Sequence, residues 1–351
     1  MAMGDGINGV FFSSKELEVG VGLDASNVGT AFAGTFTAIE SDSVTPPTFN
    51  DIKIERRGGS GSGTMTATTD MFHYGKGATI EGSVSGYLTN ELMVILMKNI
   101  TGIDHATIWS FDGTSTSNVK FEHGATSDES LTLTFAYNGA VSGSLDDCVK
   151  IPGCVITSLT ISGDPNEDGG RMKFDASWIS RTPINISSTY STSNTIGAFS
   201  TNYVFLGDYS SHCAIANVDV LLKSYSITIE NPVTFLGWGG NGESSDGAPQ
   251  TYVRSIPEFS VVVNPVVKYD TNVDALWEHA RGNTEGTQAE TLTSPAFEMA
   301  NNATYSSGTR AVRITDGTVT EISWDEGDYL GLNVSIKARG DNAVSFYTKH
   351  A

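Results

Sequence analysis

The chain has 351 residues and a net charge of −20, from 40 acidic and 20 basic side chains. This length predicts two domains, and the acidic balance excludes a protein that holds nucleic acid by neutralising phosphates with clustered Lys and Arg. Glycine is abundant, at 38 residues, and only 17% of the side chains are charged. That composition is typical of short strands joined by turns and predicts a mainly β protein. Because a long apolar run and a secretory signal are both missing, we expect synthesis inside the cell and no membrane partner.

The first half of the chain is predicted to begin with an arm at residues 1–35. Apolar and polar residues then alternate, which predicts strands at 36–40, 51–55, 64–69 and 78–87. A break is expected at Pro46-Pro47, and a glycine-rich loop at Gly58–Gly63. A helix is predicted from an N-cap at Thr89 to a stop at Gly102, because its apolar residues recur at helical spacing: Leu92, Met93, Leu96 and Ile100.

One strand–turn–strand pattern occurs twice. Its first strand is 156–160 in one copy and 319–323 in the other, an offset of 163 (157 to 320). Its second strand places apolar residues at every second position, from Met172 to Trp178 and from Leu330 to Ile336, an offset of 158 (172 to 330). A hairpin accepts the difference because turns tolerate changes in length.

Two further anchors extend this duplication. Residues 226–230 match 51–55 at an offset of 175, and a glycine-rich loop follows each of them. Residues 269–272 match 87–90 at an offset of 182, and a second short helix is predicted next, with Val273, Leu276, Trp277 and Ala280 on one face and Gly282 as its stop. We therefore predict two domains of one kind, at 36–183 and 218–351, joined by a Ser/Thr-rich linker at 184–217.

No pattern of catalytic or metal-binding residues emerges. Asp164–Gly169 with Asp175 resembles a calcium loop, but strand-like flanks and Arg171 at an apolar position favour a hairpin turn. The histidines are far apart, the cysteines (Cys148, Cys154 and Cys213) form no CxxC motif, and no GxSxG motif is present. We expect no enzymatic activity, no metal and no cofactor.

Two segments carry a resemblance to a known family. Pro152–Ser162 and Gly169–Arg181 combine a Gly-Cys pair, a strand, a Gly-Gly turn and an alternating strand, and so resemble the tail tube proteins of long-tailed bacteriophages. Tyr225–Pro232 and Pro257–Val263 resemble the same family, and the likeness covers most of 50–345. It implies two β-sandwich tube domains, each with a short flanking α-helix, whose sheets join those of neighbouring subunits into a closed β-barrel around a lumen.

The function implied by the resemblance is that of a structural virion protein. Stacked rings of it would form the tail tube, a conduit for DNA ejection in the virion tail, assembled in the host cytoplasm. Most members carry one tube domain and form six-fold rings, so two domains imply a homotrimeric, pseudo-hexameric ring, with a homohexamer as the alternative. The implied partners are the tape measure protein, the tail terminator or tip proteins, and DNA that passes without tight binding.

The same resemblance directs attention to particular residues. A lumen lined by carboxylates repels phosphates, although acidity also fits a protein that is simply soluble. Glu55 and Glu230 are the lumen candidates, because they alternate with apolar neighbours. The candidates for contacts between rings or subunits lie in the two glycine-rich loops: Arg56, Arg57, Gly59, Gly61, Trp238, Gly240 and Asp246. The alternative functions are a capsid decoration protein, a tail terminator or a carbohydrate-binding module.

Overall fold

The computed structural model of the chain describes residues 17–23, 34–50, 53–55, 72–74, 79–101, 118–122, 130–137, 148–180, 196–209, 211–235, 252–254, 260–270, 294–301, 310–326, 330–339 and 344–349, with isolated positions at 32, 273, 276, 277 and 292. These residues form a mainly β protein with one α-helix. The prediction of a mainly β fold is therefore confirmed. No helix in the described ranges is long and apolar enough to cross a membrane.

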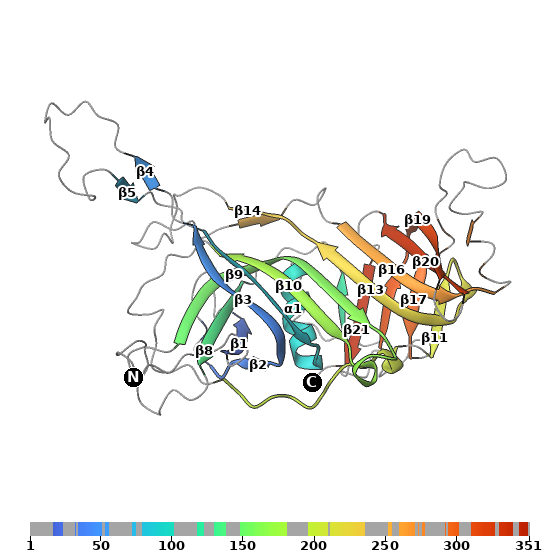
Figure 1. The fold of residues 1–351 in the computed structure, drawn as a ribbon, viewed down its shortest axis with the longest axis horizontal. Helices are drawn as coiled ribbons and strands as arrows, with labels where there is room; N and C mark the ends of the chain where they lie inside the picture. The colour runs from blue at the N-terminus through green and yellow to red at the C-terminus, as the bar shows by residue number, and fades with distance from the viewer. Residues whose placement is uncertain are drawn as a thin grey trace, which may run out of the picture.

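One long antiparallel sheet dominates the molecule (Figure 1). Its main path runs β3 (Ser41–Asn50), β6 (Thr79–Tyr87), β10 (Lys173–Ser180), β9 (Cys148–Gly163), β13 (Leu222–Glu230), β16 (Ser260–Lys268), β20 (Leu330–Ala338) and β19 (Gly317–Glu326). A branch leaves from β9 through β8 (Leu131–Tyr137), β1 (Leu17–Leu23) and β2 (Thr37–Ile39). The path ends at β3 and β19, so the described strands of one chain do not close into a barrel.

Three smaller sheets complete the set of described strands. A six-stranded sheet has the order β12 (Val218–Asp219), β11 (His212–Ile215), β17 (Phe297–Ala300), β18 (Ala311–Ile314), β21 (Val344–Lys349) and β7 (Asn118–Glu122). Two further pairs are β4 (Lys53–Glu55) with β5 (Phe72–Tyr74), and β14 (Val233–Phe235) with β15 (Tyr252–Arg254). Figure 1 shows β4 and β5 well away from the long sheet.

A single hydrophobic core joins the long sheet, the six-stranded sheet and helix α1 (Asn90–Thr101). The predicted N-cap is confirmed, because the Thr89 Oγ1 atom accepts a hydrogen bond from the Leu92 amide at 3.3 Å. The helix is fixed to the sheet by buried Asn99, whose Oδ1 atom accepts the Ile156 amide at 2.7 Å. The second predicted helix falls mostly outside the described residues, although Val273 and Leu276 are both buried.

The two halves of the long sheet repeat one strand order. We call β3, β6, β10 and β9 the first repeat, and β13, β16, β20 and β19 the second repeat; within each, the strands are neighbours in that same order. The pairings match residue by residue: Ile161 lies opposite Phe174 in the first repeat, and Trp324 lies opposite Leu332 in the second. The predicted offsets of 163 (161 to 324) and 158 (174 to 332) are thereby confirmed.

Even the irregularities of the sheet occur twice. A β-bulge inserts Thr157 into β9, and another inserts Thr320 at the matching place in β19. Each threonine donates its hydroxyl to a carbonyl on the neighbouring strand, of Ser177 and of Ser335, at 3.3 Å in both cases. A second bulge inserts Asp42 in β3 and Lys223 in β13. Shared bulges at matching positions are strong evidence that the two repeats have one backbone plan.

Two of the sequence anchors were misplaced. Val44 of β3 and Tyr225 of β13 occupy equivalent positions, opposite Val84 and Pro265, an offset of 181 (84 to 265). The match of 226–230 with 51–55 at an offset of 175 is therefore wrong, because 226–230 corresponds to β3 instead. Residues 53–55 form β4, whose pairing with β5 corresponds to that of β14 with β15 at an offset of 180 (53 to 233).

The alignment of residue 87 with residue 269 was wrong by one position. The amide of Leu88 donates to the Met172 carbonyl, and the amide of Tyr269 donates to that of Leu330. Because Met172 and Leu330 are equivalent, Tyr269 corresponds to Leu88. The corrected offset of 181 (88 to 269) is the same one that relates the strands before it.

Candidate functional site

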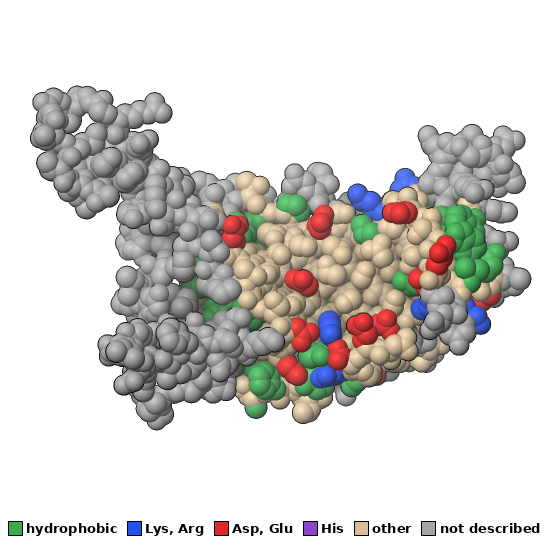
Figure 2. Space-filling model, in the orientation of Figure 1, with side chains coloured by type: hydrophobic (Ala, Val, Ile, Leu, Met, Phe, Trp, Pro, Cys, Tyr) green, Lys and Arg blue, Asp and Glu red, His purple; other side chains and the backbone are tan. Residues whose placement is uncertain are grey.

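The outward face of the long sheet carries mostly small hydroxyl side chains, and we call it the hydroxyl face. Along each strand the alternate residues point into the core, which leaves the others on this face. Figure 2 shows it as a broad area with few hydrophobic side chains and scattered carboxylates. The hydroxyl residues at these alternate positions are Ser43, Thr45, Thr79, Ser83, Ser85, Ser158, Thr160, Ser162, Ser177, Ser224, Ser226, Thr228, Ser260, Thr318, Ser323 and Ser335.

Several of these hydroxyls bond to one another across the strands. The Ser83 Oγ atom donates to the Thr45 Oγ1 atom at 3.0 Å, between β6 and β3. The Thr160 and Thr228 Oγ1 atoms lie 3.1 Å apart, between β9 and β13. Hydroxyls paired in this way offer few strong, localised binding groups to a passing molecule.

Carboxylates outnumber cations on the described part of this face. Lys173 forms an ion pair with Asp168 at 2.6 Å, and Lys223 pairs with Asp325. Lys268 on β16 and Lys337 on β20 add two further exposed cations. The exposed carboxylates between these points are Glu81, Asp175, Glu230 and Glu321. The face therefore has an excess of negative charge and no basic cluster of the kind that holds a phosphate backbone.

The predicted site residues fall in different places. Glu230 is exposed at the end of β13, on the hydroxyl face. Glu55 belongs to β4, outside the long sheet, so the structure does not bring the two carboxylates to equivalent positions. The predicted contact residues all lie outside the described ranges: Arg56, Arg57, Gly59, Gly61, Trp238, Gly240 and Asp246. The strands that flank the two loops are nevertheless equivalent in the two repeats.

The two repeats join edge to edge through β9 and β13. This internal junction is an antiparallel ladder in which Ser158 through Gly163 pair with Glu230 through Tyr225. No strand in the described ranges pairs with the outer edge of β3 or of β19. β3 is equivalent to β13, and β19 is equivalent to β9. The free edge of β3 therefore corresponds to the edge of β13 that pairs with β9, and the free edge of β19 corresponds to the edge of β9 that pairs with β13.

Large hydrophobic side chains are exposed beside the free edge of β19. Trp324 is 44% exposed and Leu330 is 51% exposed, whereas their equivalents in the first repeat, Ile161 and Met172, are 1% and 0% exposed. Figure 2 shows a hydrophobic patch at this end of the sheet. Sequence reasoning missed it, because the alternation that marks Trp324 as a strand residue does not tell whether a neighbour covers it.

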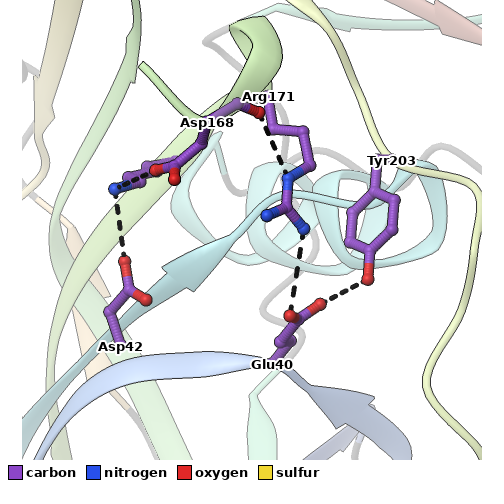
Figure 3. A network of polar contacts seen from close by, with 6 residues as sticks. Glu40, Asp42, Asp168, Arg171 and Tyr203 are labelled. Carbon is purple, nitrogen blue, oxygen red and sulfur yellow. Dashed lines mark hydrogen bonds and ion pairs between the residues drawn. The ribbon is translucent and has the colours of Figure 1, made fainter.

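A polar network fastens the segment 196–209 to the first repeat (Figure 3). The Arg171 guanidinium lies 3.9 Å from the Tyr87 ring centroid and 5.0 Å from that of Tyr203, and 3.9 Å from a Glu40 carboxylate oxygen. Tyr203 donates its hydroxyl to the other oxygen of Glu40, which raises the pKa of Tyr203. On the other side of the turn, the Lys173 ammonium lowers the pKa of Asp168 by hydrogen bonding to it.

The same segment is also tied to helix α1. The Glu91 carboxylate accepts Asn202 Nδ2 at 2.7 Å and Ser200 Oγ at 3.0 Å. Partial burial disfavours the charged form, but these hydrogen bonds outweigh it and lower the pKa of Glu91. The predicted linker therefore contains an ordered stretch that packs on the first repeat.

The loop with calcium-like spacing forms the turn between β9 and β10. The Asp164 Oδ1 atom accepts the Asn166 amide at 2.8 Å within the turn, and Asp168 pairs with Lys173. Asp168, Gly169 and Gly170 have φ values of 48°, 68° and 79°, a left-handed run that suits a tight turn. Within the described ranges, no group of three His, Cys, Asp or Glu residues is placed to hold a metal ion.

No protein-family model matches the sequence, and no curated protein matches it.

Proposed function

We propose that this chain is a structural protein that assembles into stacked rings, as the tail tube proteins of long-tailed bacteriophages do. The single observation that carries the proposal is the edge-to-edge joining of two equivalent repeats. That arrangement leaves one free edge of each kind per chain, among the strands that the structure describes. A contact between unlike edges of successive copies is heterologous, and it closes into a ring when the rotation at each junction fits.

The proposed ring contains three chains. Each chain contributes two repeats in tandem, so three chains give six, in keeping with the six-fold rings of the family that the sequence resembles. In this ring the two repeats are tandem tube domains, built as sandwiches, and their sheets continue into a closed barrel. Closure leaves no unpaired strand edge around the ring, and so removes a risk of uncontrolled association.

The chemistry of the hydroxyl face supports a conduit for DNA. In the proposed barrel this face lines the lumen, where its excess of carboxylates repels phosphates and its paired hydroxyls bind weakly. Glu230 is one of the lumen carboxylates in this arrangement. The proposed location is the virion tail, and the proposed partners are the tape measure protein, the tail terminator or tip proteins, and DNA in transit.

Electron microscopy of the purified chain tests the proposal directly. Negatively stained preparations at increasing protein concentration are expected to contain hollow rings or tubes, and class averages viewed along the axis are expected to show six similar lobes. Mass measurement of single rings then distinguishes three chains from six. Monomers at every concentration and salt condition would reject the tube function. Rings of six chains would be consistent with the tube function but would reject the proposal that three chains, with two repeats each, form one ring.

A further inference from the structure

The internal junction between the repeats serves as a template for the contact between chains. Its ladder pairs Gly163 with Tyr225 and Thr160 with Thr228. Since β19 repeats β9 and β3 repeats β13, each of these residues has an equivalent at a free edge of the chain.

Transfer of the ladder to the free edges gives a definite register. The offset of 163 that relates β9 to β19 makes Glu326 the equivalent of Gly163. Two offsets relate β3 to β13. The offset is 181 up to Thr45 (45 to 226) and 180 from Thr48 on (48 to 228). It changes because β3 has a further bulge between these two threonines. The resulting pairs across two chains are Glu326 with Val44, Asp325 with Thr45, Ser323 with Thr48, and Glu321 with Asn50.

We propose that β19 of one copy pairs antiparallel with β3 of the next copy in this register, and that the contact covers Trp324 and Leu330. The inference rests on the proposed ring function, which it makes specific. The occupant of the free edge is thus a second copy of this chain.

The exposed hydrophobic patch supports this choice of occupant. Ile161 is buried at the internal junction, where it pairs with Ile227 of the following repeat. Its equivalent, Trp324, is 44% exposed and packs against Tyr269 and Trp277, with ring centroids 5.0 and 5.3 Å away. In the first repeat, this side of the sheet is covered by β13 of the second repeat. In the second repeat, the equivalent side is exposed. The first repeat of another chain would cover it in the same way.

The sequence of β3 fits an edge that accepts a strand from another chain. Pro46 and Pro47 occupy its second bulge, between the residues that pair with Ser83 and Glu81. Proline donates no backbone hydrogen bond, so it is tolerated at a bulge of an edge strand. In the proposed register the two prolines oppose Trp324, and the ladder continues on both sides of them.

Paired cysteines test the register. We expect Ser323→Cys combined with Thr48→Cys to form disulfides between chains, because directly opposed residues of an antiparallel pair lie within the reach of a disulfide. Thr160→Cys combined with Thr228→Cys is the matched control, since these residues hold the same relative position inside one chain and must form an internal disulfide. Glu321→Cys combined with Thr48→Cys is the shifted control, in which the partner lies two positions away on the same face.

The expected result is a ladder of covalent dimers and trimers on non-reducing gels. The yield should be at least about ten-fold higher than for the shifted control, whose residues are separated by a diagonal distance of about 7–8 Å. A mixture of the two single variants should give dimers only, and Ser323→Cys alone should give none, because the contact joins unlike edges.

The outcomes separate the register from the function. If the parent chain forms tubes but the shifted control cross-links better, or neither pair does, the register is overturned and the tube function stands. If the cross-linked ladder appears in a chain that never forms rings or tubes, the edge contact stands and the tube function fails. An internal disulfide in the matched control shows that the oxidation conditions were adequate in each case.

Discussion

Replacement of Trp324 by alanine is expected to weaken assembly by about two orders of magnitude. The side chain is 44% exposed in the isolated chain. With about 250 Å² for a fully exposed tryptophan, about 110 Å² would be covered by the next copy. At about 25 cal/mol per Å², this burial contributes about 2.8 kcal/mol to each contact. That free energy corresponds to about a hundred-fold increase in the protein concentration needed for assembly.

Sedimentation velocity over a range of concentrations measures this threshold. Phe199→Ala is the control, because Phe199 is 56% exposed and lies on the segment 196–209, which is part of neither edge strand. Its threshold should stay within about three-fold of the parent chain, since its exposed area is not covered at the proposed contact. Urea unfolding of each variant separates assembly from folding. A Trp324→Ala chain that folds normally and assembles at the parent concentration would refute the reasoning.

Three further predictions concern the single chain. Gly86→Ala should destabilise the fold by about 3 kcal/mol in urea unfolding, because a Cβ atom there would clash with the backbone oxygen of Glu40, whereas Gly207→Ala, with nothing within 4 Å, should change stability by less than about 0.5 kcal/mol. Burial raises the pKa of Cys213 to about 12, so its thiol should resist labelling at pH 8 until the chain unfolds; rapid labelling of this residue in the native state would contradict its burial. The pKa of Asp168 is lowered by its hydrogen bond with Lys173, so its contribution to stability is present above pH 4 and lost as the pH falls through the folded-state value. The stability difference between the parent and Asp168→Asn should therefore shrink between pH 6 and pH 3, and a difference that is constant over this range would exclude the ion pair as its cause.

The duplicated hairpin could be predicted from the sequence because it depends on local alternation. Met172 to Trp178 and Leu330 to Ile336 place an apolar residue at every second position, and the core requires that pattern wherever the strands pair. The bulges at Thr157 and Thr320 were not predictable, since a threonine in a strand carries no local sign that it is the inserted residue.

The strand β3 was missed for a physical reason. Pro46 and Pro47 indicated a break, as they do in the interior of a sheet, but β3 lies at an edge of the described sheet and holds the prolines in a bulge. Without β3, the strand 226–230 was matched to 51–55, which has similar alternation. The local sequence pattern could not show that β3 is an edge strand, because the position of a strand within a sheet depends on pairing with residues that are distant in the chain.

The outward face was predicted only in part. Alternation identified Glu230 as a residue that points away from the core, and the structure places it there. It could not show that Thr160 and Thr228 meet at 3.1 Å, because that contact depends on the register between two strands that are distant in the chain. The Arg171 network was missed for the same reason, since Tyr203 comes from a distant segment.

The covalent continuity of the internal junction has a kinetic consequence for assembly. In a proposed ring of three chains, half of the six junctions form within a chain as it folds, where the partner strand is held at an effective concentration of about millimolar. Of the remaining three junctions, two require an encounter between molecules, and the third closes the ring within the assembled trimer. A ring of six separate repeats would need five encounters before closure, so fusion of the repeats lowers the order of the reaction and makes ring formation less sensitive to dilution.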